Sequence, residues 1–178
     1  MNSALPRCQP LTTPSRCRNS SSTSFSEATV WATSSINNSL YANQIFGNSG
    51  PGIDLGADGV TPNDSNDVDS GPNGLLNYPH LTRVRFNGAT STLYGEACPN
   101  CTIYIYTIQT NPLHAGGGYQ DAFPITVHSD ASGAWVITFV AGLNPQTVTF
   151  QACQAADCSV NPDANTSELS LVVSNFIY

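Results

Sequence analysis

Residues 43–81, NQIFGNSGPGIDLGADGVTPNDSNDVDSGPNGLLNYPHL, decide how this chain is organised, because their composition differs from that of the sequence on either side. Glycine, asparagine and proline recur throughout the stretch, so we expect the backbone to turn repeatedly here. Oxygen-bearing side chains gather in the same segment, at Asp54, Asp58, Asn63, Asp64, Asp67 and Asp69. This segment is therefore where we expect a ligand to bind.

These six side chains predict a calcium site. Calcium takes about six to eight hard oxygen ligands and accepts them from flexible loops. Several carboxylates in one compact segment repel one another, and a divalent cation relieves that repulsion. The spacing is not that of an EF-hand, because the closing glutamate is missing. The alternative is that the Asp and Asn side chains only cap turns, as they do in many loops.

Four short strings within the stretch resemble a junction found in many bacterial secreted and surface proteins, where a right-handed parallel β-helix ends and an immunoglobulin-like β-sandwich begins. The strings are GIDLG (52–56), DGVTPND (58–64), DVDSGPN (67–73) and NYP (77–79). The resemblance implies a β-helix-like end before residue 80 and a sandwich after it. The chain departs from these proteins at its N-terminus, where they carry many coils and this sequence has hardly any.

Residues 80–178 alternate short apolar runs with turn residues, which is the pattern of an all-β domain. We expect strands at 81–86, 91–96, 102–108, 123–129, 134–140, 147–153 and 168–173. Seven strands suit an immunoglobulin-like β-sandwich of about a hundred residues. Trp135, Ile137 and Phe139 alternate along one strand and should face the core, and residues 129–133 should form the hairpin turn before it.

The sequence before residue 80 divides into two parts. Residues 1–35 are predicted to form an extended arm rich in Ser and Thr, with strand-like alternation at 25–32. In residues 36–79, small apolar side chains recur between asparagines, as in the coils of a parallel β-helix. One or two coils cannot bury their faces alone, so this segment must end a solenoid or be capped by another domain.

The charge of the chain narrows its partners. Twelve Asp and Glu residues face five Arg and no Lys, for a net charge of -7. Nucleic acids and anionic membranes are bound mainly through Lys and Arg, so the composition argues against both. Only 10% of the residues are charged, against about 25% in ordinary soluble domains. This polar but weakly charged composition favours an extracellular or cell-surface location.

Six cysteines form three close pairs along the sequence: Cys8 with Cys17, Cys98 with Cys101, and Cys153 with Cys158. An even number in short spacings fits local disulfides in an oxidising compartment. The alternative is a zinc site built from the second and third pairs, since four thiolates can close a tetrahedron. We find no secretory signal and no apolar run of about 20 residues that could span a membrane, and we expect the chain to be part of a longer protein.

Catalysis is not expected. His80, His114 and His128 are dispersed and match no nucleophile or metal motif, while the carboxylate enzymes among parallel β-helices use a groove built from many coils. We therefore expect a non-catalytic extracellular structural module, a surface or filament-forming subunit. The polar arm and the apolar end 169–178 could each complete the sheet of another copy by strand addition.

A calcium-dependent carbohydrate-binding or adhesion module is the alternative function. Exposed aromatic side chains would be its signature, and Tyr104, Tyr106 and Tyr119 are the candidates for glycan contact. The first two lie on one face of an expected strand. Alternation does not decide which face of that strand is outside, because both faces are apolar.

Overall fold

The computed structural model describes residues 28–30, 36–40, 51–56, 58–107, 125–140, 148–158, 161 and 164–170, with the backbone alone at 28–30, 107 and 140. Statements below concern these residues. The predicted strand at 25–32 and the end 169–178 are described in part, and Cys8, Cys17 and Tyr119 lie outside the described residues. No helix of the described part is long and apolar enough to cross a membrane.

Short strands make up nearly all the regular structure of the described part, so the prediction of an all-β fold is confirmed. The one helical element is a single 3-10 turn. In chain order the elements are β1 (Ala28–Val30), β2 (Ile53–Leu55), η1 (Pro72–Leu75), β3 (His80–Asn87), β4 (Thr90–Glu96), β5 (Thr102–Thr107), β6 (Ile125–His128), β7 (Ala134–Val140) and β8 (Val148–Cys153).

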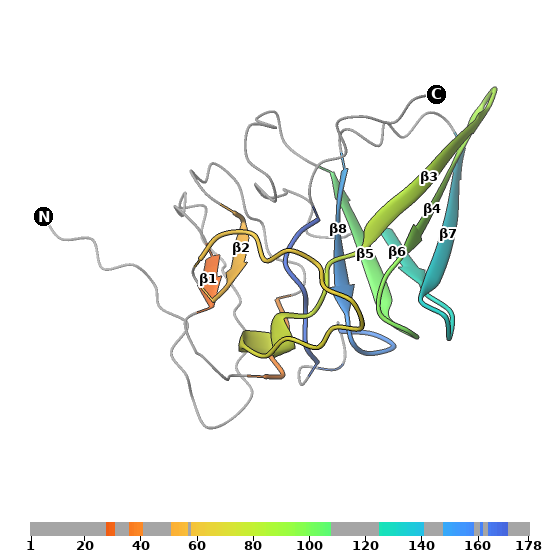
Figure 1. Ribbon diagram of the computed structural model, residues 1–178. Helices are drawn as coiled ribbons and strands as arrows, with labels where there is room; N and C mark the ends of the chain where they lie inside the picture. Colours follow the sequence, from red (N-terminus) through yellow and green to blue (C-terminus); the bar gives the residue numbers. More distant parts are fainter. Residues whose placement is uncertain are drawn as a thin grey trace, which may run out of the picture.

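The strands form three sheets (Figure 1). β1 and β2 pair in parallel, with Ala28 opposite Ile53. The other two sheets are antiparallel and have three strands each, in the orders β3-β4-β7 and β6-β5-β8. In Figure 1, β6-β5-β8 lies between the β1–β2 pair and the β3-β4-β7 sheet. The middle sheet is therefore covered on both sides.

One hydrophobic cluster joins the two antiparallel sheets, with contributions from β3, β4, β5, β7 and β8. Trp135 is 3% exposed, and its ring centroid lies 5.3 Å from that of Phe150 on the other sheet. The predicted core position of Trp135 is confirmed, and Ile137 and Phe139 pack against the same cluster. Gly95 makes room for the indole, since a Cβ there would overlap both the Trp135 ring and the His80 carbonyl oxygen.

A second hydrophobic cluster lies on the opposite face of the middle sheet. Tyr104 and Tyr106 of β5 point into it and meet Leu40, Ile53 and Leu55 from the N-terminal side of the chain. Residues of the predicted segments 36–79 and 80–178 therefore share one core. This sharing explains why every residue of β8 is buried, because its alternate side chains enter the two clusters in turn.

The outer edge of β8 is covered by residues 164–170, which run beside it without forming the predicted strand. Serine hydroxyls occupy the positions of ladder acceptors: the N–H of Ala152 donates to Ser167 Oγ (2.9 Å) and the N–H of Phe150 to Ser170 Oγ (2.9 Å). One isolated bridge, between Cys153 and Thr166, is the only strand-like pairing of this segment within the described residues. The backbone N–H groups of Ser167 and Ser170 donate back to the carbonyl oxygens of Ala152 (2.9 Å) and Phe150 (2.8 Å). Serine hydroxyls thus replace only the acceptors of a regular ladder, and its donors remain backbone groups.

Residues 129–133 connect two sheets and do not form a hairpin, so that prediction is wrong. β6 pairs with β5, whereas β7 pairs with β4. The Asp130 side chain shapes the turn by accepting the N–H of Ser132 (2.7 Å) and the N–H of Ala134 (3.1 Å). Hydrogen bonds from Ser132 lower the pKa of Asp130 below its usual value. A local Asp turn of this kind looks the same in sequence whichever sheet the next strand joins.

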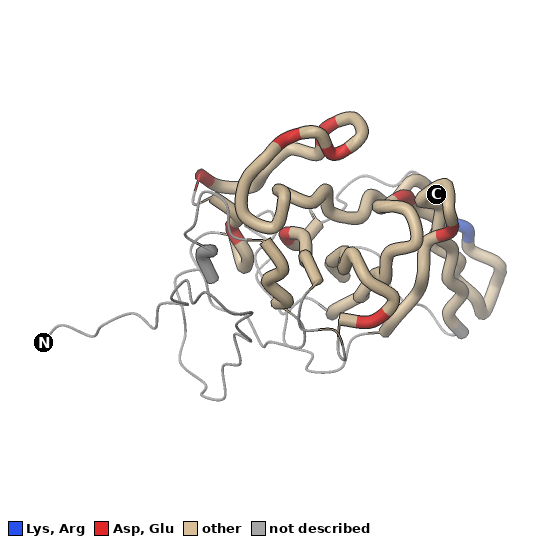
Figure 2. Tube along the Cα trace, turned by 90° about the horizontal axis from the view of Figure 1, so that it is seen from below, with Lys and Arg blue, Asp and Glu red and all other residues tan. Residues whose placement is uncertain are grey.

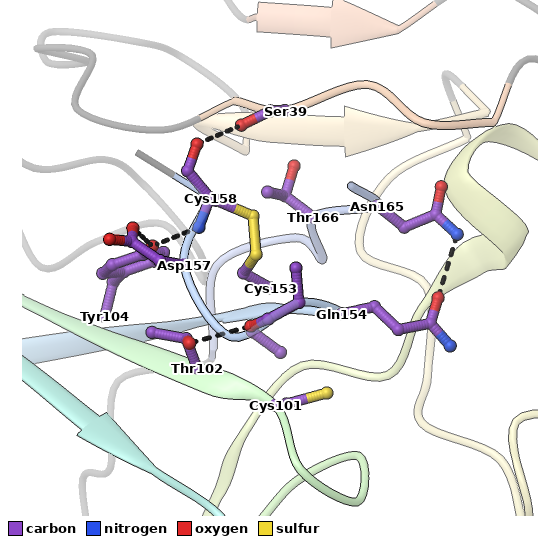
Figure 3. The surroundings of a disulfide bond; sticks show 12 residues. Ser39, Cys101, Thr102, Tyr104, Cys153, Gln154, Asp157, Cys158, Asn165 and Thr166 are labelled. Atoms are coloured by element: carbon purple, nitrogen blue, oxygen red, sulfur yellow. Dashed lines mark hydrogen bonds between the residues drawn. A yellow bond between two sulfur atoms is a disulfide. The ribbon is translucent and has the colours of Figure 1, made fainter. Parts of the chain in front are cut away.

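Two of the three predicted disulfides are present: Cys98–Cys101, with Cα atoms 5.5 Å apart, and Cys153–Cys158, with Cα atoms 6.1 Å apart. The alternative of a zinc site from these four thiols is therefore wrong. Figure 3 shows the second disulfide among its neighbours, where the N–H of Cys158 donates to the Tyr104 hydroxyl at 2.9 Å. This bridge ties the segment after β8 to the second hydrophobic cluster.

Candidate metal centre

The acidic loop, which we define as residues 58–71, joins β2 to η1. Figure 2 shows acidic positions in red on a segment that projects from the body of the molecule. At the turn of the loop, Asn66 (φ 67°) and Asp67 (φ 54°) both adopt the left-handed conformation, which these residue types tolerate better than most. The N–H of Val68 donates to Asp64 Oδ2 at 3.0 Å and closes the turn. The chain therefore folds back on itself and brings its carboxylates together.

Asp64, Asp67 and Asp69 form the acidic triad, with one carboxylate oxygen of each lying within 4.8 Å of the other two. Calcium binds oxygen at about 2.3–2.6 Å, so oxygens around one ion are separated by up to about 5 Å. The spacing of the triad fits one such ion. Three of the six predicted ligands are thus brought together by the local turn.

Asp69 is the member of the triad whose surroundings most favour a bound cation. Its Oδ1 atom is buried and accepts no hydrogen bond, although a buried carboxylate oxygen ordinarily has a donor. Burial, followed by the negative charges of Asp64 and Asp67, raises the pKa of Asp69 above its usual value. A cation held by the triad would satisfy the orphaned oxygen and offset the repulsion.

Asn77 holds the acidic loop in shape from the segment after η1. Its backbone N–H donates to Asp67 Oδ1 at 2.8 Å, and its side-chain Nδ2 donates to the Asp64 carbonyl oxygen at 2.9 Å. Its Oδ1 in turn accepts the N–H of Asp64 at 2.9 Å. Two members of the triad are therefore positioned before any ligand arrives.

Asn63, a predicted ligand, serves instead to close the base of the loop. Its Nδ2 donates to the Tyr78 carbonyl oxygen at 2.8 Å and its Oδ1 accepts the N–H of Tyr78 at 3.0 Å. Both polar ends of the amide are used in this reciprocal pair. The prediction that Asn63 contributes its side-chain oxygen to a metal is not supported by this geometry.

Asp54 and Asp58, also predicted as ligands, do not join the triad. Asp54 lies in β2, is 4% exposed, and accepts the N–H groups of Asp58 and Gly59, each at 3.2 Å. This is the turn-capping role that formed the alternative prediction for the acidic residues. The Asp58 side chain is exposed, and its Oδ1 lies near Gly56. The structure thus separates the six candidates into the triad, two residues that shape the loop through side-chain hydrogen bonds (Asp54 and Asn63) and one exposed carboxylate (Asp58).

Glu168 is a buried anchor of the acidic loop that the sequence did not predict. Its carboxylate is buried and accepts the N–H of Leu55 at 2.8 Å and the N–H of Thr61 at 2.9 Å. These bonds tie the C-terminal segment to β2 and to the start of the acidic loop. Burial raises the pKa of Glu168 to about 7, and the nearby charge of Asp54 acts in the same direction. The signal in the sequence was a lone acid in the run SELSLVV (167–173).

The tyrosines proposed for glycan contact are placed in the core. Tyr104 is 1% exposed and Tyr106 is 0% exposed, and the Tyr106 hydroxyl donates to Gln151 Oε1 at 3.2 Å. Neither ring offers a surface on which a sugar could stack, so these two assignments are wrong. The cause is that Leu40, Ile53 and Leu55 pack with both rings on the second face of the middle sheet.

No family model matches this chain, and no curated protein sequence matches it.

Proposed function

We propose that the protein is a non-catalytic extracellular structural module in which calcium, bound by the acidic triad, stiffens the joint between the β1–β2 pair and the antiparallel sheets. The observation that carries the proposal is the triad itself, with three carboxylates converging within 4.8 Å around an oxygen that has no donor. Two disulfides support an oxidising, extracellular setting.

For the architecture, we propose an immunoglobulin-like sandwich preceded by the end of a parallel β-helix. The shared core of the two antiparallel sheets supports the first part. The parallel register of β1 and β2 supports the second, because coils of a β-helix pair their strands in parallel. In this proposal, the hydrophobic cluster around Tyr104 and Tyr106 is the cap that such an end requires.

Asp64, Asp67 and Asp69 would hold the ion, with Asn77 keeping two of them in place. The role of the ion in this proposal is structural: its positive charge offsets the repulsion among the three carboxylates. The acidic loop is bonded at its base to Tyr78 and near its start to Glu168 through Thr61. A rigid loop would therefore restrict movement of η1 and the C-terminal segment relative to β2.

Calcium titration of the full chain by calorimetry tests this proposal. We expect one ion to bind, and we expect Asp69→Asn to weaken binding at least about tenfold, because it removes a charged ligand. Asp58→Asn is the matched control: it removes one carboxylate of the same loop outside the triad and should change affinity by less than about threefold. Equal loss in both variants, or no binding to the wild type, would refute the site.

We further propose that copies of the chain associate, as a surface or filament-forming subunit would, by adding a strand to a neighbour's sheet. In the described part of the two antiparallel sheets, β3, β6 and β7 have no neighbour on one side, and β1 and β2 each have an open side in their two-stranded sheet. The donor segments would be the chain ends, 1–27 and 171–178, which lie outside the described residues. Electron microscopy of the native material tests this, with fibres expected and isolated particles counting against it.

A further inference from the structure

The outward face of the β3-β4-β7 sheet carries both basic residues of the described part. Arg83 and Arg85 are exposed and alternate on β3, opposite Tyr94 and Thr92 of β4. The Arg83 guanidinium lies 5.5 Å from the centre of the Tyr94 ring. Within the described residues, no carboxylate forms an ion pair with either arginine. In a chain of net charge -7, two unneutralised cations side by side are conspicuous.

An apolar side chain lies beside these cations. Val136 of β7 is opposite Tyr94 in the sheet register and is 52% exposed. The row Arg83, Tyr94, Val136 therefore crosses the sheet, with Arg85 in the next outward row. We call these four residues the basic face. It combines positive charge with an exposed aromatic and aliphatic surface, which fits a partner that is acidic around an apolar tip.

The acidic loop has that composition. Val68 is 74% exposed, more than any other large hydrophobic side chain of the described part. It stands between Asp67 and Asp69, in the turn that brings the triad together. Exposing a valine at the tip of a charged loop costs solvation free energy, and a partner that covers it would recover that energy. The loop projects from the body of the molecule (Figure 2), so it is free to reach a second molecule.

We infer that the acidic loop of one copy docks on the basic face of another, with Val68 against Val136 and Tyr94 and the triad facing the two arginines. Such a contact joins two different surfaces, so it is heterologous and propagates from copy to copy. It deepens the proposed self-association by naming a second contact, distinct from strand addition by the chain ends. It does not need those ends, and calcium held by the triad would weaken it by offsetting the negative charge that faces the arginines.

The contact is small, so we expect it to be weak and dependent on salt. Sedimentation velocity of the full chain at about 1 mM, in chelator and low salt, should show concentration-dependent association, and about 0.5 M salt should reverse it. The double variant Arg83→Glu/Arg85→Glu and the single variant Val68→Gln should each weaken association at least about tenfold. Ile36→Gln is the matched control, because Ile36 is also an exposed apolar residue (59%) and lies on neither surface.

Mixing the variants tests the heterologous geometry. The arginine variant keeps an intact loop and Val68→Gln keeps an intact basic face, so a mixture should form dimers and no longer chains. We also expect the control Ile36→Gln to associate with the affinity of the wild type. A monomeric wild type, equal loss in Ile36→Gln, or no dimer in the mixture would overturn the inference, provided that each variant unfolds at the wild-type midpoint. Chelator keeps this test separate from calcium binding, so either proposal can fail alone.

Discussion

Among single residues, Asn73 joins three segments that are distant in sequence. It is 1% exposed, its Oδ1 accepts the N–H of Asn38 at 2.9 Å, and its Nδ2 donates to the carbonyl oxygens of Asn38 (2.7 Å) and Thr166 (2.9 Å). Its backbone is left-handed, with φ 51°. One amide thus joins the turn after the acidic loop to the segment before the loop and to residues 164–170.

Replacing Asn73 with alanine should destabilise the protein by about 2–4 kcal/mol, because three hydrogen bonds that join Asn38 and Thr166 to the Asn73 amide would be lost from a buried site. Asn66→Ala is the matched control. Asn66 is also left-handed (φ 67°), but it is exposed and its side chain bonds only Ser65 Oγ among the described residues. Urea unfolding should show a loss below about 1 kcal/mol for the control. Similar losses in both variants would show that backbone conformation, and not the bridge, accounts for the effect.

The acidic triad could be predicted from the sequence, whereas Asn73 and Glu168 could not. Asp64, Asp67 and Asp69 lie within six positions of one another, so a local turn is sufficient to bring them together. The partners of Asn73 and Glu168 lie up to 113 positions away, and no local pattern encodes such contacts. The prediction that Tyr104 and Tyr106 contact a glycan failed for the same reason, because the side chains that bury them come from distant parts of the sequence.

Among the elements, the C-terminal segment 164–170 is held against β2 by the Glu168 carboxylate. Asp54 lies near this carboxylate. Burial raises the pKa of Tyr78, and the negative charge of Glu168 raises it further. The native pKa of Glu168 is about 7, above the ordinary value of 4.5, so the native state binds the proton more tightly than the unfolded state. Stability from this group is complete below about pH 4.5 and is lost as pH rises through 7.

Urea unfolding of the wild type between pH 4.5 and pH 8 should therefore show a decline of up to about 3 kcal/mol from this group. Glu168→Gln removes the titrating carboxyl and should flatten that part of the profile. The variant should also lose some stability at pH 4.5, because Leu55 and Thr61 donate to different carboxylate oxygens and the amide nitrogen that replaces one of them is a donor and cannot accept an N–H. A variant that retains the full decline would show that other groups cause it.

The strands that were predicted well are those whose pattern is local. The predicted segment 134–140 coincides with β7, and the other predicted strands from 81 to 153 differ from the observed bounds by at most one residue within the described part. Sheet membership was not predictable, because the turn 129–133 carries no sign of which sheet the next strand enters. The predicted strand at 168–173 does not form in its described part. The hydroxyl groups of Ser167 and Ser170, and not backbone carbonyls, accept the N–H groups of β8 there.

At the scale of the molecule, the described residues form three layers in which the middle sheet is buried on both faces. The acidic loop lies on the side of β2 and η1, and it is bonded to the layers through Asn63, Asn77 and Glu168. In our proposal, the loop without an ion is the least stable part of this joint, because its carboxylates repel one another. Calcium at about 100 times its dissociation constant would stabilise the fold by about 2.7 kcal/mol.

Amide hydrogen exchange with and without calcium tests the stiffened joint most directly. The N–H groups of Val68 and Asn77 donate to triad carboxylates, so calcium should slow their exchange at least about tenfold. The N–H of Ser129, bonded to the Cys101 carbonyl oxygen at 3.0 Å, is the internal control and should change little. Asp69→Asn should abolish the effect of calcium. Unchanged exchange at Val68 and Asn77 under saturating calcium would contradict the proposed joint.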